Sequence, residues 1–396
     1  MGRRKKIESR ILVKEKMIIS DIQPTIWKKL LKIKANQRIG SAYVFTGSSG
    51  SGKEWASIQF AKLINCNELK DALCNNCNSC LQFNSLQHQN LKLIFPLPAG
   101  INSNKNKGPI DSLKKEEFDY ITKSLELKSK DPFYKINVPK ANRIPISCIR
   151  DLHKTIYLKT DSSNKKIVII FDAHLLSQGM GESANALLKI LEEPPKNTIF
   201  ILVTDKKSAL LPTIMSRCQE IAFPILDLDT IRIMLEEKGV KNQQAIELAM
   251  IVGGDFRQAI DLVNSNENFV LEIKNLVNQI INISENGWRE FINNFSMLAY
   301  RNPEEFKFKF YLLQTWFHQA YRSRVGIYKS EDLEELKNSL NQFNKKYPNA
   351  NLNEINKLLE ESVHSLSRNL YTPLMLTNFL ISLQKLLKGK ELEPIL

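Results

Sequence analysis

The fold of this chain is decided by two short stretches, residues 187–195, which read LLKILEEPP, and residues 216–218, which read SRC. One helix face carries apolar residues at the i, i+3, i+4, i+7 spacing: Ala184, Leu187, Leu188 and Leu191. The proline pair that closes the first stretch ends this helix. The apolar run at residues 199–204, IFILVT, then predicts a buried strand. Arg217 follows beside a helix end, where an arginine can reach the nucleotide site of a neighbouring subunit. The alternative is that Arg217 only forms a salt bridge at that helix end.

Strands and helices alternate along the first half of the chain. Their periodicities predict helices over residues 24–35, 54–65 and 146–158, and buried strands over residues 42–46 and 167–171. Such alternation is typical of an α/β sandwich with a parallel sheet. From residue 226 onward the spacing of apolar residues predicts helices almost throughout. Two apolar stripes there are expected to be core: Phe306, Phe310, Leu313 and Phe317, and Leu376, Phe379, Leu380, Leu383 and Leu387.

Length and hydropathy exclude a membrane span. The 396 residues suffice for two or three domains, and the chain has no apolar run of about 18 residues. The basic start, MGRRKK, is not followed by the apolar stretch of a signal peptide. Met17 is an alternative start site. We therefore expect a cytoplasmic protein.

The net charge of +14 permits two interpretations. A strongly basic chain favours a nucleic-acid partner. However, Lys outnumbers Arg by 42 to 14, which equally fits a composition rich in lysine throughout. Charge alone therefore does not identify the partner.

A glycine-rich loop follows the predicted strand at residues 42–46. It matches the phosphate-loop pattern and consists of Gly47, Ser48, Ser49, Gly50, Ser51, Gly52 and Lys53. Backbone N–H groups of such a loop cradle phosphates, and the lysine reaches the outer ones. The alternative is an ordinary Gly/Ser turn.

Two positions near this loop depart from an active ATPase. Glu54 stands where a Ser or Thr hydroxyl would hold Mg²⁺. Asp172 ends a strand and could coordinate Mg²⁺, but the next residue is Ala173 instead of the Glu that would polarise the attacking water. The sequence therefore predicts weak ATP binding at most, and no hydrolysis by this chain.

Four cysteines, Cys66, Cys74, Cys77 and Cys80, are separated by seven, two and two residues. Four thiolates satisfy a tetrahedral Zn²⁺ and leave no open position, so the predicted site is structural. The alternative is chance clustering of reduced thiols.

Residues 98–142 lack the regular spacing of apolar residues seen on either side, and they are rich in Lys, Asn, Gly and Asp. We interpret them as an insertion that is partly ordered at most.

Several stretches together resemble bacterial clamp-loader subunits, the AAA+ proteins of DNA polymerase III. They are residues 38–39, 42–47, 149–150, 185–195 and 213–218, together with the four cysteines. The likeness runs from about Ile22 to Phe223, and beyond that only the helical pattern agrees. Glu54 and Ala173 favour the delta prime branch, because the gamma and tau ATPases keep the magnesium Ser/Thr and the catalytic Glu. This sequence departs from the family pattern at Ser41, where relatives often carry His, and in its long insertion.

The resemblance implies an α/β AAA+ P-loop domain with an inserted zinc module, followed by an all-α lid and an all-α collar. The corresponding segments are a basic extension (1–20), the nucleotide-binding-like domain (21–224) with its zinc module (66–80) and insertion (98–142), the lid (225–268) and the collar (269–396). Residues 254–257, GDFR, resemble the lid segment in which Arg257 would sense nucleotide.

The resemblance also implies the partners and the role of Arg217. The partners would be gamma/tau and delta subunits, the sliding clamp, and primed DNA through the complex, in a nucleoid-associated assembly. Arg217 would act as an arginine finger on a neighbouring ATPase. The cofactors would be structural Zn²⁺ and, weakly, ATP with Mg²⁺. Two other functions remain open: an active gamma/tau-like ATPase, and a stand-alone zinc module that binds nucleic acid.

Overall fold

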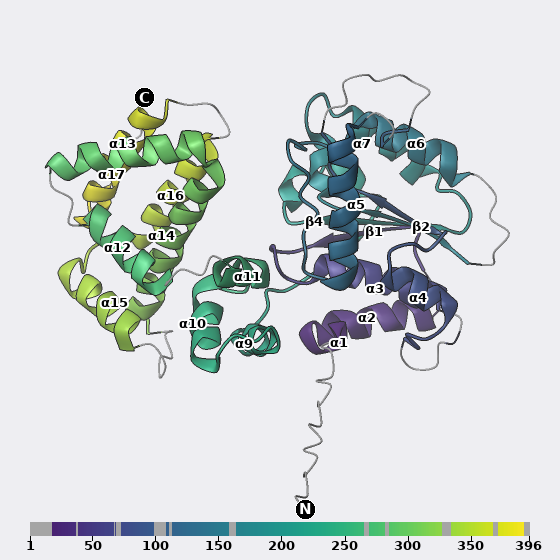
Figure 1. Ribbon diagram of the computed structural model, residues 1–396, viewed down its shortest axis with the longest axis horizontal. Coiled ribbons are helices and arrows are strands. Elements are labelled where there is room, and N and C mark those ends of the chain that lie inside the picture. The colour runs from purple at the N-terminus through teal and green to yellow at the C-terminus, as the bar shows by residue number, and fades with distance from the viewer. Residues whose placement is uncertain are drawn as a thin grey trace, which may run out of the picture. The chain divides into compact units, whose positions relative to one another are not determined.

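The structure is a computed structural model that describes residues 18–36, 39–66, 68, 73–98, 108–110, 113–157, 164–264, 269–281, 285–326, 334–366 and 371–391. It divides into two compact units, seen in Figure 1. We call Met1–Leu226 with Asp255–Arg257 the sheet unit, and Asp227–Gly254 with Gln258–Leu396 the helical unit. Each is described by itself.

The sheet unit is built on a five-stranded parallel sheet in the order β2-β3-β4-β1-β5. The strands are β1 (Ala42–Thr46), β2 (Leu91–Ile94), β3 (Lys166–Ile170), β4 (Thr198–Thr204) and β5 (Gln219–Ala222). β1 and β4 are buried along their whole length, as expected for central parallel strands covered on both faces. Because all strands run the same way, the residues that follow β1, β3 and β4 meet at one edge.

Helices cover both faces of this sheet. They are α1 (Ile19–Ile22), α2 (Pro24–Ala35), α3 (Lys53–Asn65), α4 (Asn78–Asn84), α5 (Lys115–Lys130), α6 (Ile146–Ile156), α7 (Glu182–Glu192) and α8 (Pro212–Met215), with 3₁₀ turns η1 (Ala173–Ser177) and η2 (Lys207–Ala209). In Figure 1, α6 and α7 lie above the sheet, and α2 and α3 lie below it. Tyr43 of β1 packs edge-on against Phe60 of α3, with ring centroids 5.4 Å apart. The sequence-predicted helices and strands of this unit are therefore confirmed to within one residue at their described ends, except that the helix predicted over residues 146–158 ends at Ile156.

Two features of this unit go beyond the sequence-based expectations. Leu188 of the predicted apolar stripe is half-buried and packs against the core, and the buried face of α7 also includes Ile190 beside Leu187 and Leu191. The described part of the insertion is also more regular than expected, because it contains the sixteen-residue helix α5. Its inward face is Ile121, Ser124 and Lys128, a largely polar stripe that hydrophobic periodicity does not detect. Residues 99–107 and 111–112 of the insertion lie outside the described residues.

The folded part of the sheet unit also begins slightly earlier in the sequence than expected. The predicted extension covers residues 1–20, but Ile19 of α1 already belongs to the buried core of the sheet unit. Residues 1–17 of that extension lie outside the described residues.

The helical unit contains α9 (Leu228–Glu237), α10 (Asn242–Val252), α11 (Phe256–Asn264), α12 (Phe269–Ile281), α13 (Glu285–Arg301), α14 (Pro303–Arg324), α15 (Glu334–Lys346), α16 (Leu352–Leu366) and α17 (Thr372–Leu387). The first residues of α11 group with the sheet unit. α14 is the central helix and packs against α12, α13, α15 and α16. Both predicted apolar stripes are buried, and stacked rings of Phe306 and Phe310, 4.4 Å apart, sit in this core. The division of this unit into a lid (225–268) and a collar (269–396) stays a prediction.

Within the described ranges, no helix combines the length and the apolarity that a bilayer crossing requires.

Candidate functional site

The phosphate loop joins β1 to α3, as the sequence predicts. Gly52 adopts a left-handed conformation (φ 84°) at the N-cap of α3, and Lys53 is the first helical residue. Gly50 is also left-handed (φ +67°), and a Cβ there would lie 2.1 Å from the Oδ1 atom of Asp255. Only glycine fits so close to residues 255–257. The loop is therefore packed tightly against the segment that carries Arg257.

Lys53 is turned back onto its own loop. It is 6% exposed, and its Nζ donates a hydrogen bond to the backbone oxygen of Ser48 at 2.9 Å. Burial lowers the pKa of Lys53, and the nearby Asp205 carboxylate opposes that shift. The lysine that would reach the outer phosphates is thus buried and bonded internally.

Glu54 forms a buried ion pair with the insertion helix. Its Oε2 atom lies 2.5 Å from Nζ of Lys128, whose side chain is fully buried. Burial alone would raise the pKa of Glu54, but Lys128 and then Arg257 more than offset it and bring the pKa to about 2. Glu54 is therefore a stable carboxylate at the position where a magnesium-binding hydroxyl would stand.

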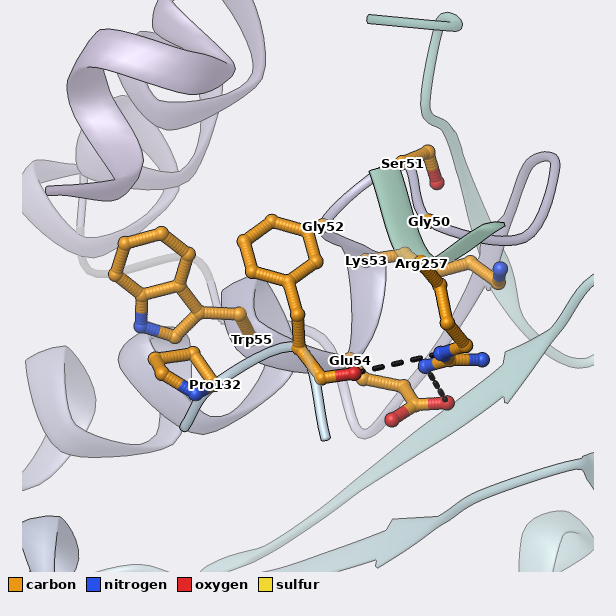
Figure 2. A pocket seen from close by; sticks show the side chains of 9 residues that line it. Gly50, Ser51, Gly52, Lys53, Glu54, Trp55, Pro132 and Arg257 are labelled. Atoms are coloured by element: carbon orange, nitrogen blue, oxygen red, sulfur yellow. Dashed lines mark hydrogen bonds and ion pairs between the residues drawn. The ribbon is translucent and has the colours of Figure 1, made fainter. Parts of the chain in front are cut away.

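Arg257 completes the charge cluster. Its Nη2 atom lies 3.4 Å from Oε1 of Glu54, and its Nε donates to the backbone oxygen of Phe133 at 3.3 Å. Figure 2 shows the Arg257 guanidinium beside the Glu54 carboxylate. Nη1 also donates to Oγ of Ser49 in the phosphate loop at 3.5 Å. Arg257 therefore lies at the phosphate loop, and its role as a nucleotide sensor stays a prediction.

A small pocket remains at this place (Figure 2). It is lined by residues of the phosphate loop, of α3, of the segment after α5, and by Arg257: Gly50, Ser51, Gly52, Lys53, Glu54, Trp55, Pro132, Phe133 and Arg257. Gly47, Ser48 and Ser49 do not line it. Its walls combine one buried carboxylate, two cations and apolar rings.

Asp172 follows β3 at the same edge of the sheet. Its Oδ1 atom lies 3.0 Å from Nζ of Lys135, a second lysine of the insertion. Ala173, the next residue, is completely buried at the start of η1. His174 is buried too, and its Nδ1 lies 3.0 Å from Oγ1 of Thr204 and 3.6 Å from Oδ1 of Asp205. The donor atoms of Asp172, His174 and Asp205 lie within 4.8 Å of one another, so this group could hold a metal ion.

The four predicted cysteine ligands converge. Their Sγ atoms lie within 4.8 Å of one another; the Cys66–Cys74 pair is 3.5 Å apart and the Cys74–Cys80 pair 3.7 Å apart. All four are free thiols. A tetrahedron with Zn–S bonds of about 2.3 Å has S···S edges of about 3.8 Å, close to these separations. The cluster therefore fits a closed four-thiolate metal site.

Local structure supports that interpretation. Cys77 caps the start of α4, and its Sγ accepts a hydrogen bond from the backbone N–H of Cys80. The N–H groups of Cys77 and Asn76 lower the pKa of Cys74 to about 6, which favours the thiolate that metals bind, whereas burial and the neighbouring thiols raise the pKa of Cys80. The buried ammonium of Lys62, held by Asn75 and Asn84, and that of Lys34 lie near the thiols. These two cations would balance the double negative charge of four thiolates around Zn²⁺.

Arg217 lies just after α8 on the surface. Its side chain is about one-third exposed, its Nη2 contacts Oε1 of Glu192 at 2.8 Å, and its Nη1 donates to the backbone oxygen of Thr213 at 2.9 Å. The salt-bridge alternative for Arg217 is thus observed as a contact. An exposed pair of this kind contributes roughly 0–1 kcal/mol, so a stronger partner can draw the guanidinium away.

Sequence reasoning missed Lys128 and Lys135, the two residues of the insertion that reach the acidic groups of the site. No motif marks them, because they are two lysines in a segment rich in lysine. The one available signal was local: an unpaired Glu54 beside a phosphate loop requires a buried cation somewhere in the fold.

The family model described as DNA polymerase III, delta subunit matches residues 22–227, more than half of the chain. The chain belongs to that family. Membership of the DNA polymerase III clamp-loader proteins is thereby confirmed.

Individual relatives do not separate the branches of this clamp-loader family. The chain is 29% identical to the delta prime subunit of Bacillus subtilis DNA polymerase III over 63% of this chain and 61% of that protein. It is 28% identical to the tau subunit of the same organism over 62% of this chain and 37% of that protein. The matched part thus spans about three-fifths or less of the length of these relatives. A gamma subunit-related protein of known structure from Thermotoga maritima aligns with 90% of this chain and 99% of its own, at 17% identity and a TM-score of 0.38, which is too low to refine the assignment.

We expect the purified clamp-loader chain to hold one zinc ion, measured by elemental analysis after mild purification. The double substitution Cys77→Ser/Cys80→Ser should abolish the metal and lower the thermal unfolding midpoint by at least roughly 5 °C, because a structural metal contributes directly to folding. Cys218→Ser, outside the cluster, is the matched control and should change neither quantity. Absence of zinc, or an unchanged midpoint in the double variant, would refute the site.

Proposed function

We propose that this chain is a delta prime-like subunit of a DNA polymerase III clamp loader, which does not itself hydrolyse ATP. In this proposal it assembles with gamma/tau and delta subunits and supports loading of the sliding clamp onto primed DNA. Its own contribution to chemistry is Arg217, offered to the nucleotide site of a neighbouring ATPase subunit.

The main support for the proposal is that the phosphate site of this chain lacks the groups that ATP hydrolysis needs. Hydrolysis needs a base to orient the attacking water and ligands for Mg²⁺. Ala173 has no group that could accept a proton, and it is completely buried. Glu54 and Asp172, at the two magnesium-holding positions, are each paired with a lysine. These features favour a subunit that has lost hydrolysis over an active gamma/tau-like ATPase.

Two observations favour the alternative of an active ATPase. The loop pattern from Gly47 to Lys53 is nearly complete, and the chain resembles tau about as closely as delta prime. A stand-alone zinc module that binds nucleic acid is favoured only by the net charge of +14, and it would require tight, salt-sensitive DNA binding without partners.

The two leading functions differ in ATP turnover by the isolated chain. We expect the purified chain to co-purify with gamma/tau and delta subunits of its own organism, and to show no ATP turnover above background when assayed alone. The gamma/tau subunit assayed in parallel is the positive control. ATP turnover by the isolated chain that disappears in Lys53→Ala would establish the active-ATPase alternative instead.

The proposed finger makes a second prediction, because an arginine that stabilises charge on the transferred phosphoryl group acts only in the assembled complex. Arg217→Ala should leave folding and assembly intact but lower the ATPase rate of the assembled loader at least about tenfold. Clamp loading should slow in parallel.

The Glu192 contact supplies the matched control for this test. Glu192→Ala removes the same surface pair while leaving the guanidinium free, so it should keep the ATPase rate at or above that of the wild type. If Glu192→Ala lowered the rate as much as Arg217→Ala, the salt bridge rather than a finger would be responsible.

A further inference from the structure

The described part of the insertion places two lysines on the acidic groups of the phosphate site. Lys128, near the end of α5, contacts Glu54, and Lys135, in the segment after α5, contacts Asp172. The two carboxylates come from different elements, the start of α3 and the end of β3. One short stretch of chain, residues 128–135, therefore bridges both of them.

Lys128 is built into this position. Its side chain has no exposure, and its ammonium donates to Glu54 at 2.5 Å, to the backbone oxygen of Pro132 at 3.0 Å and to that of Tyr134 at 2.7 Å. These acceptors use all three N–H donors of a lysine. The ammonium also lies 5.5 Å from the centre of the Phe171 ring, a favourable cation–π distance. A charge desolvated so completely persists only because its partners are in place.

The segment after α5 is anchored by packing as well as by charge. The Phe133 ring lies 5.8 Å from that of Trp55 on α3 and 4.8 Å from that of Phe256. The backbone oxygen of Phe133 accepts a hydrogen bond from Arg257, and Pro132 and Phe133 line the pocket beside the phosphate loop (Figure 2). The contacts of Phe133 therefore hold the backbone between Lys128 and Lys135 against the phosphate loop.

In a phosphate-loop nucleotidase, the residue after the loop lysine and an Asp at a strand end together hold Mg²⁺. Here two lysines supply the same two positive charges to the same two positions. We propose that residues 113–142 act as an internal ligand of the phosphate site, in which Lys128 and Lys135 replace the magnesium ion and keep MgATP from binding to this chain.

This inference goes beyond the proposed function and is separable from it. Nucleotide binding is measured on the isolated chain, whereas the proposed function is tested by assembly and by the ATPase of the complex. A chain that binds MgATP could still assemble, and a chain that does not assemble could still exclude MgATP.

The test is MgATP binding by isothermal titration calorimetry on the full chain. The wild type should show no saturable binding up to millimolar MgATP. The variant Glu54→Ser/Lys128→Met/Lys135→Met restores a hydroxyl after Lys53 and removes both cations without adding a buried charge. It should bind at least about tenfold more tightly than the wild type, because apparent affinity scales with the fraction of sites that are open.

A matched control is available on the same helix. Lys130 lies two residues from Lys128, but it is exposed and pairs with Glu126 at 2.5 Å. Lys130→Met removes the same kind of charge from α5 and should leave MgATP binding absent.

A second measurement covers the case in which the triple variant folds poorly. Amide hydrogen exchange of residues 115–135 should accelerate at least about tenfold in Glu54→Ser, because the anchor of α5 is lost, and stay unchanged in Lys130→Met. Saturable, Lys53-dependent MgATP binding by the wild type would overturn the proposal. So would unchanged exchange of α5 in Glu54→Ser, or a folded triple variant that gains no binding.

Discussion

A carboxylate buried beside a phosphate loop must be neutralised, and this single constraint organises the site. Glu54 is the second residue of α3, directly after the phosphate loop, and its side chain is well shielded from water. An uncompensated charge there would cost several kcal/mol. The ammonium of Lys128 and the guanidinium of Arg257 remove that cost, and they come from segments far apart in sequence. Through these two ion pairs Glu54 links the end of α5 and residues 255–257 to the start of α3.

The parallel sheet brings the residues of the site together from distant parts of the sequence. Because β1, β3 and β4 end at the same edge, the phosphate loop, Asp172 and Asp205 are brought together without any of them being near in sequence. In an active relative that edge would collect a nucleotide and its metal. In this chain Lys128 and Lys135 of the insertion lie at that edge and pair with its carboxylates. Arg217 lies on the surface of the same unit, and its partly exposed contact with Glu192 belongs to a class of ion pairs that contributes little stability.

The sequence predicted the elements of the sheet unit closely, because buried parallel strands and amphipathic helices leave strong periodic signals. β1 and α2 begin and end at the predicted residues. The four cysteines and the phosphate loop were found for a similar reason, since their spacing reflects local geometry. Helix α5 was not found, because its buried face includes Ser124 and Lys128 and so mimics a polar surface. The pairing of Lys128 with Glu54 is a tertiary contact across 74 positions, and no local pattern in either segment specifies it.

The central claim is that Glu54 and Lys128 stabilise each other as a buried pair, and a double-mutant cycle tests it most directly. Glu54→Gln, Lys128→Met and the double variant would be unfolded in urea and followed by tryptophan fluorescence and circular dichroism. Each single substitution leaves one buried charge unpaired and should cost roughly 3–5 kcal/mol. The double variant should cost less than the sum of the two by at least about 1 kcal/mol. Strictly additive losses in the free energy of unfolding would show that the two groups do not interact and would contradict the account.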